Sequence, residues 1–131
     1  MDRQQFENLI GEAVAALPQS IRQKLSNVDI ILEEGESPDN SLFGLYHGVP
    51  QTARGSAYGM APTLPDKITI YKGTIEKFAL RQAQGLSARD QDIEIQNLVR
   101  RVVWHEIGHH FGFDEAQIRK LEKKWAKEHK I

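Results

Sequence analysis

Two histidines near the C-terminal end of the chain have the type and the spacing of a metal centre. His105 and His109 are four residues apart in the segment WHEIGHHFGFDE. On a helix, 100° per residue separates such a pair by about 40° in azimuth and by one turn in height, so both imidazoles can reach one ion. Because the chain has no cysteine, a bound metal must be held by histidine or carboxylate side chains.

Glu106 lies between the two histidines. By the same angular step it is about 60° further round the helix than His109, where it can touch a water on the ion but is poorly placed to ligate beside both histidines. The pattern His-Glu-x-x-His is typical of zinc hydrolases, in which the ion lowers the pKa of a bound water towards ~7 and the glutamate accepts its proton. We therefore interpret Glu106 as the candidate catalytic base and expect Zn²⁺ as the cofactor.

A catalytic zinc needs a third protein ligand and an open fourth position. Gly112 allows the left-handed conformation that ends a helix and turns the chain back. Glu115, ten residues after the first histidine, is then the leading candidate for the third ligand. The alternatives are Asp114, Glu122 and Glu128. An ordinary role as the N-cap or a first-turn acid of the next helix stays open for Asp114 and Glu115.

The other residues near the motif are interpreted as structural. His110 points away from the ligand face, so we expect it to pack or to support a neighbouring group. His47 and His129 have no spacing relation to the motif and are expected to be surface or loop residues. Three aromatic residues are expected in the core: Trp104, Phe111 and Trp125.

Helices are predicted at both ends of the chain. Apolar residues recur at three- and four-residue steps between Asp2, a candidate cap, and Pro18. The helix that carries the motif is predicted to begin at Ser87 or Asp90 and to end at Gly112. A final helix follows, with Ile118, Leu121 and Trp125 on one face.

The middle of the chain predicts strands. Residues 28–32 and 67–71 are rich in β-branched side chains, whereas residues 42–49 fit a short strand or an irregular segment. Flanking proline and lysine residues suggest that 67–71 is an edge strand. Residues 74–84 are predicted to be a helix capped by Thr74, and residues 50–65 a long loop of the kind that lines a functional site.

Composition limits the class of protein. The chain has 131 residues and 17 Lys and Arg against 18 Asp and Glu, a net charge of −1. We expect one soluble domain over residues 1–131. The absence of a basic excess argues against a nucleic-acid partner. No apolar run approaches the roughly 20 residues that cross a bilayer, and the N-terminus lacks signal-peptide features. A cytoplasmic location without a membrane partner is expected.

The motif resembles that of the zincin metallopeptidases, and more closely that of a small bacterial zincin-like family of possible zinc metallopeptidases. The shared features are the segments 42–55, 65–73 and 99–115, so the resemblance covers about the C-terminal two-thirds of the chain. It implies an α+β minimal zincin fold, with a small mixed sheet, a backing helix and an active-site helix.

The resemblance also implies roles for individual residues. His105 and His109 match the zinc ligands and Glu106 the catalytic glutamate, while Glu115 falls where such motifs place a third His or Asp. No methionine follows Met60, so the Met-turn of metzincins is absent. The implied activity is peptidase activity.

Two functions follow from these observations. The first is a zinc-dependent peptidase whose peptide or protein substrate adds to the predicted edge strand 67–71 by main-chain hydrogen bonds. The alternative is a zinc-stabilised peptide-binding module without catalytic activity; a metal-free structural domain is a third, weaker hypothesis. Candidate donors to the developing oxyanion are Tyr46, Tyr58, Tyr71 and Arg54. The substrate sequence and the oligomeric state do not follow from the sequence.

Overall fold

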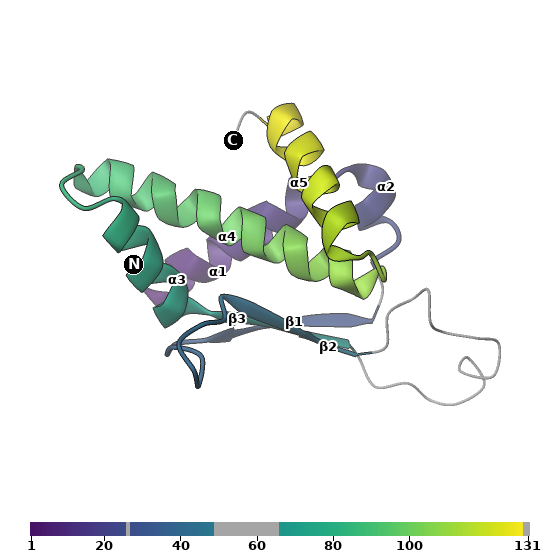
Figure 1. The fold of residues 1–131 in the computed structure, drawn as a ribbon, viewed down its shortest axis with the longest axis horizontal. Coiled ribbons are helices and arrows are strands. Elements are labelled where there is room, and N and C mark those ends of the chain that lie inside the picture. The colour runs from purple at the N-terminus through teal and green to yellow at the C-terminus, as the bar shows by residue number, and fades with distance from the viewer. Residues whose placement is uncertain (26, 49–65, 130–131) are drawn as a thin grey trace.

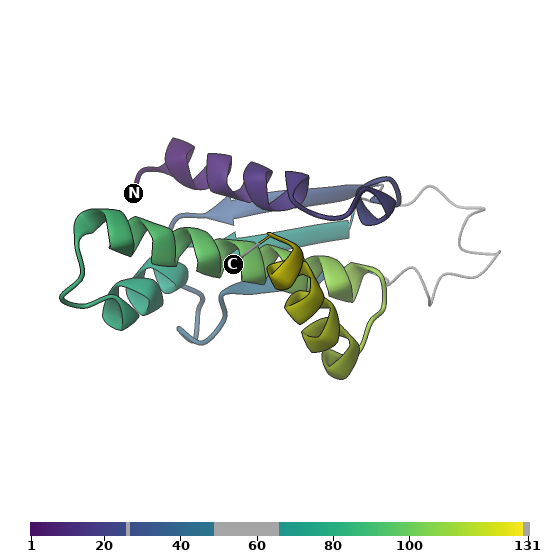
Figure 2. The ribbon, with the colours of Figure 1, turned by 90° about the horizontal axis from the view of Figure 1, so that it is seen from above.

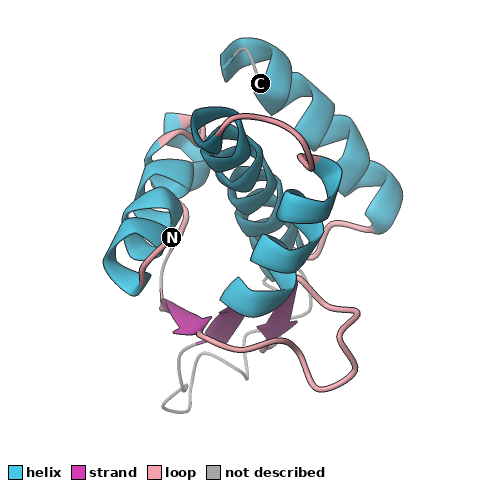
Figure 3. Cartoon of the chain, turned by 90° about the vertical axis from the view of Figure 1, so that its left-hand side faces the viewer, coloured by secondary structure: helices cyan, strands magenta, loops and turns pink. Residues whose placement is uncertain are grey.

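The computed structural model describes residues 1–25, 27–48 and 66–129, except for the side chains of residues 125, 126, 128 and 129. In this part of the chain, helices lie over one face of a small sheet (Figures 1 and 3). The elements are α1 (Arg3–Ala15), α2 (Gln19–Arg22), β1 (Val28–Glu33), β2 (Gly44–His47), β3 (Asp66–Tyr71), α3 (Lys72–Gln82), α4 (Ala88–His110) and α5 (Glu115–His129). This arrangement confirms the predicted α+β class with a small mixed sheet.

The order of the strands corrects one prediction. The sheet formed by the described residues has the order β1-β3-β2, with β1 parallel and β2 antiparallel to β3. The strand predicted at the edge, residues 67–71, is therefore the central strand, and β2 is an edge strand. Lys67 is exposed on the solvent face, and Lys72 pairs with Glu76 at the start of α3. Lys67 thus marks a solvated face and Lys72 the start of a helix. Neither feature indicates whether a strand is paired on both edges.

The core lies between the sheet and helices α1 and α4. Alternate residues of β3 are buried, among them Ile68 and Ile70, which have no exposed surface. They belong to one apolar cluster with Val99 and Val103 of α4. Helix α1 runs beside α4 over the sheet (Figure 2), and the indole Nε1 of Trp104 donates a 2.9 Å hydrogen bond to a main-chain carbonyl of α1. The predicted core positions of Trp104 and Phe111 are confirmed; the side chain of Trp125 lies outside the described residues.

The helix ends agree with the sequence at α1 and α4 but not at α3. Asp2 caps α1 through a capping box with Gln5, and Ser87 caps α4. Helix α3 begins at Lys72, so Thr74 is not its cap. Instead, Thr74 is buried inside the helix and its Oγ1 accepts a hydrogen bond from the backbone N–H of Ser37. The predicted loop over residues 50–65 lies outside the described residues. No described helix has the length and apolar character of a membrane span.

Helices α4 and α5 pack tightly against each other at Gly108. A Cβ atom added there would lie 2.7 Å from Cγ1 of Ile118, a side chain that is 1% exposed. Real Cβ atoms essentially never come this close to their neighbours, so a larger residue at 108 requires the Ile118 side chain or its helix to shift. The position of α5 thus depends on a glycine inside the motif segment.

We expect Gly108→Ala to destabilise the protein. Overpacking typically costs about 1–3 kcal/mol, which outweighs the gain of about 0.5–1 kcal/mol from replacing a helical glycine by alanine. Urea unfolding of the metal-free protein measures the difference. The matched control is Gly11→Ala in α1, where an added Cβ meets nothing within 4 Å and only the helical gain applies. Equal stabilisation by both substitutions would contradict the close approach.

Candidate metal centre

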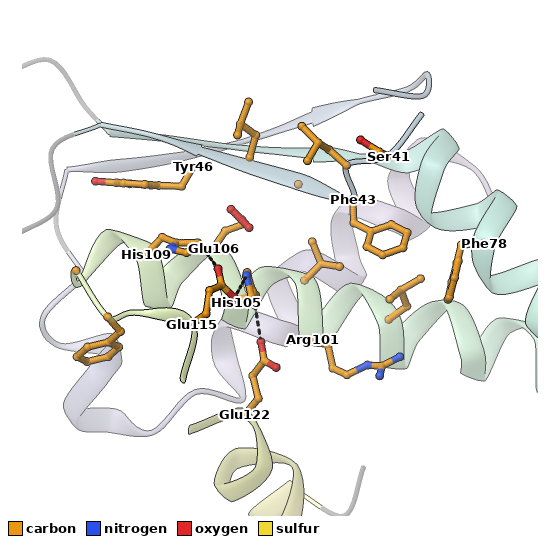
Figure 4. A pocket seen from close by; sticks show the side chains of 17 residues that line it. Ser41, Phe43, Tyr46, Phe78, Arg101, His105, Glu106, His109, Glu115 and Glu122 are labelled. Carbon is orange, nitrogen blue, oxygen red and sulfur yellow. Dashed lines mark hydrogen bonds and ion pairs between the residues drawn. The ribbon is translucent and has the colours of Figure 1, made fainter. Parts of the chain in front are cut away.

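Two helices bring the three predicted ligands together. His105 and His109 lie in the last turns of α4, and Glu115 lies in the first turn of α5. Nε2 of His105 is 3.4 Å from Oε2 of Glu115, and Nε2 of His109 is 3.2 Å from Oε1 of the same carboxylate. One ligand atom from each of the three residues lies within 4.8 Å of the others. In Figure 4 their side chains point toward a common position at the edge of a cavity.

A tight turn places Glu115 opposite the histidines. Gly112 has a φ of 81°, the left-handed conformation that favours glycine. Its N–H donates to the carbonyl of His109, and the N–H of Phe113 donates to the carbonyl of Gly108. These bonds end α4 and reverse the chain.

Asp114 and Glu115 divide the two roles that the sequence left open. The Oδ1 of Asp114 accepts the N–H of Gln117 at 2.8 Å, and the Gln117 side chain accepts the N–H of Asp114. This reciprocal pair is the pattern of a capping box. Asp114 therefore caps α5, and the next residue, Glu115, faces the histidines.

Glu122 lies on the other side of His105. Nδ1 of His105 is 3.0 Å from Oε1 of Glu122. This hydrogen bond raises the pKa of His105 above its ordinary value, against the opposing effect of burial. A carboxylate on Nδ1 fixes the ring so that Nε2 is presented to an ion. Glu122, an alternative third ligand in the sequence analysis, thus supports a ligand instead. The sequence signal is its spacing of seven residues from Glu115, two turns along one helix face.

The donor set fits zinc. Histidine nitrogen and carboxylate oxygen are ordinary zinc ligands, and tetrahedral bonds of about 2.0–2.2 Å separate neighbouring donors by about 3.3–3.6 Å. The distances of 3.2 and 3.4 Å between Glu115 and the two histidines are close to that value. Within the described ranges, no fourth His, Asp or Glu joins this group. Three protein ligands with an open position are the pattern of catalytic rather than structural zinc sites.

Glu106 lies beneath β2, beside the ligand group. It is 7% exposed. Burial raises the pKa of Glu106, while the nearby rings of His105 and His109 and a backbone hydrogen bond from Tyr46 lower it. The edge strand therefore contacts the candidate base directly through its main chain.

A cavity of about 810 Å³ opens beside these groups. Its walls are β2 with the residues before it, the face of α4 that carries the histidines, and the start of α5 (Figure 4). Ligand pockets in proteins typically have volumes of about 300–1,000 Å³. The cavity is therefore large enough for a ligand that contacts both the histidine group and the edge strand.

His110 belongs to a buried polar network between the end of α4 and the sheet. It has no exposed surface, and its Nδ1 lies 2.8 Å from Oδ2 of Asp66, which also accepts the hydroxyl of Tyr46 at 2.7 Å. This network connects β2 and β3 to the end of α4, and it agrees with the supporting role predicted for His110. The sequence analysis did not identify Asp66.

Of the four predicted oxyanion donors, only Tyr46 is found in the described lining of the cavity. Tyr46 lines the cavity, but its hydroxyl donates to Asp66. Tyr71 lies at the end of β3, outside the lining of the cavity. Tyr58 and Arg54 lie outside the described residues.

Comparison with known proteins identifies the family. The profile described as zincin-like metallopeptidase matches residues 23–125, which include the whole motif and Glu122. The chain belongs to this zincin-like metallopeptidase family. A search of curated proteins gave no match.

Glu122→Gln is expected to weaken zinc binding. Loss of a carboxylate partner of a ligating histidine typically costs about 10–100-fold in metal affinity. Competition with a chromophoric chelator measures the dissociation constant. The control is Glu12→Gln, which removes the same charge from an exposed position on α1. An unchanged affinity in Glu122→Gln would mean that this contact does not orient His105.

Removal of the metal is expected to loosen α5. This helix carries Glu115, so an ion shared with His105 and His109 would connect it to α4 in addition to the packing of Ile118. With chelator present, amide hydrogen exchange in residues 115–129 should accelerate more than in α1, which serves as the internal control. Equal protection of α5 with and without zinc would show that packing alone positions it.

Proposed function

We propose that the protein is a zinc-dependent peptidase in which His105, His109 and Glu115 bind the ion and Glu106 is the catalytic base. The observation that carries this proposal is the convergence of the three ligand side chains beside a buried glutamate and an open cavity. When bound at such a group, zinc activates a water molecule and polarises a carbonyl.

Glu106 has the surroundings that a base needs. Its carboxylate lines the cavity, is shielded from bulk water by β2, and lies on the same helical turn as both histidines. From there Glu106 takes a proton from the attacking water and delivers it to the leaving amine. A hydrogen bond from the backbone N–H of Tyr46 partly offsets the effect of burial on the pKa of Glu106.

The edge strand β2 supplies a binding surface for a peptide. One side of β2 pairs with β3, and its other side carries main-chain groups that β3 does not use. A peptide that pairs with this side lies in the cavity, across the motif face of α4. The peptide or protein partner inferred for strand 67–71 is therefore reassigned to residues 44–47.

Glu106→Gln is expected to abolish hydrolysis while leaving the metal bound. Loss of a general base typically costs about 10²–10⁴-fold in rate, and glutamine keeps the shape of the side chain. Mass spectrometry of a mixed peptide library incubated with zinc-loaded protein measures cleavage, and elemental analysis measures the metal. The control is Asp92→Asn, an exposed substitution on the same helix.

Two other outcomes are informative. Full hydrolysis by Glu106→Gln would refute the assigned role of Glu106. Wild-type protein that binds zinc and peptides but cleaves none of them would support the alternative function, a zinc-stabilised peptide-binding module.

A further inference from the structure

The cavity extends well beyond the metal ligands into a part lined by apolar side chains. We call this part the apolar arm; it is formed by Leu42, Phe43, Phe78, Leu98 and Val102. Leu98 and Val102 lie on α4, seven and three residues before His105, so they continue the motif face toward the start of the helix. In Figure 4, Phe43 and Phe78 stand on the side of His105 that is opposite to His109.

Two aromatic rings form the far wall of the apolar arm. The rings of Phe43 and Phe78 meet edge to face, with centroids 5.1 Å apart. Phe78 is nevertheless 38% exposed. The arm therefore presents aromatic surface to solvent inside a concave site, where a ligand group would remove it from water.

Arg101 adds a positive charge beside the apolar arm. It is the one Arg or Lys that lines the described part of the cavity, whose other charged residues are the histidines and three glutamates. Within the described residues the side chain of Arg101 forms no ion pair or hydrogen bond. It lies one helical turn before His105, and Figure 4 shows its side chain directed away from that histidine, toward Phe78. Its complement is an anionic group on the ligand.

The spacing along α4 suits an extended peptide. Leu98, Arg101 and Val102 precede His105 by about 10.5, 6 and 4.5 Å of helix rise. One residue of an extended peptide spans about 3.3 Å. In a peptide paired with β2, the three residues nearest the metal group on this side therefore lie along the apolar arm.

We infer that the apolar arm binds a large apolar side chain of the substrate peptide, within three residues of the bond at the metal centre, and that Arg101 binds a carboxylate next to it. That the bound peptide is a substrate rests on the proposed peptidase function. The binding of the peptide does not. The carboxylate comes either from the C-terminus of the peptide or from an Asp or Glu side chain.

Binding to zinc-loaded Glu106→Gln protein tests the inference without cleavage. The probes are acetylated tetrapeptides of alanine with Phe at one position, in three series. The first has a free C-terminal carboxylate and the second a C-terminal amide, each with Phe at each of the four positions in turn. The third has a C-terminal amide with Asp as the last residue and Phe at each of the first three positions. We expect one Phe position to bind about tenfold more tightly than alanine. A carboxylate should add about two- to fivefold, the usual gain from an exposed ion pair.

Variants assign these gains to residues. Phe78→Ala should remove about three- to tenfold of the preference for Phe, whereas Leu80→Ala, an exposed residue on the same helix that does not line the cavity, should not. Arg101→Gln should remove the gain from the carboxylate, and Arg100→Gln, its neighbour outside the cavity lining, should keep it. A gain in the free-acid series alone indicates recognition of the C-terminus, and a gain in the Asp series alone indicates an acidic side chain.

The failure of this inference is distinguishable from failure of the proposed function. Equal binding of Phe and Ala peptides, or an unchanged preference in Phe78→Ala, overturns the apolar arm. A carboxylate gain that survives Arg101→Gln, or no such gain in either series, overturns the role of Arg101. Cleavage of the library without preference would overturn the inference but support the peptidase function. Selective binding without cleavage by wild-type protein would support the inference but overturn the peptidase function.

Discussion

The pairing of two imidazoles with two carboxylates across the α4–α5 junction is the interaction on which the site depends. Glu115 faces both histidines, and Glu122 forms a hydrogen bond with Nδ1 of His105. Neither carboxylate belongs to the motif helix, so the geometry depends on where α5 docks. The left-handed turn at Gly112 sets its direction, and the contact between Gly108 and Ile118 sets its distance. The motif thus contributes two candidate ligands, and its Gly108 also forms the contact surface for α5, the helix that carries Glu115.

The sheet contributes to the same site through its edge. Because β3 is central, β2 is left with one side unpaired by β3, above the face of α4 that carries the histidines. Tyr46 connects the two layers twice: its N–H reaches Glu106, and its hydroxyl reaches Asp66, which also contacts His110. The same strand that borders the cavity thus contacts the buried glutamate, and the polar network of Tyr46, Asp66 and His110 connects the strand to the helix.

Local patterns predicted the elements, and long-range pairing decided what they could not. The spacing of His105 and His109, the caps at Asp2 and Ser87, and the turn at Gly112 follow from interactions within a few residues, and all agree with the structure. The central position of β3 depends on pairing with two other strands. A lysine on the exposed face of a strand is compatible with either an edge or a central strand, so it could not predict this position. Thr74 resembled a cap because its hydroxyl can accept an N–H, but the N–H that it accepts comes from Ser37 in a remote loop. The role of Glu122 required knowing how α5 lies on α4.

Among the described residues, the groups around the candidate metal position come from one short stretch, residues 105–122. Closing a loop of this length costs the unfolded chain about 3 kcal/mol, and a longer separation would cost only a little more because the cost grows logarithmically. The unfolded chain can therefore bring the same side chains around an ion only at this cost, and it retains a small part of the affinity. A ligand stabilises a fold only by the difference between its binding to the native and the denatured ensembles. Zinc held at this position would therefore raise the melting temperature by less than its dissociation constant from the folded protein alone implies.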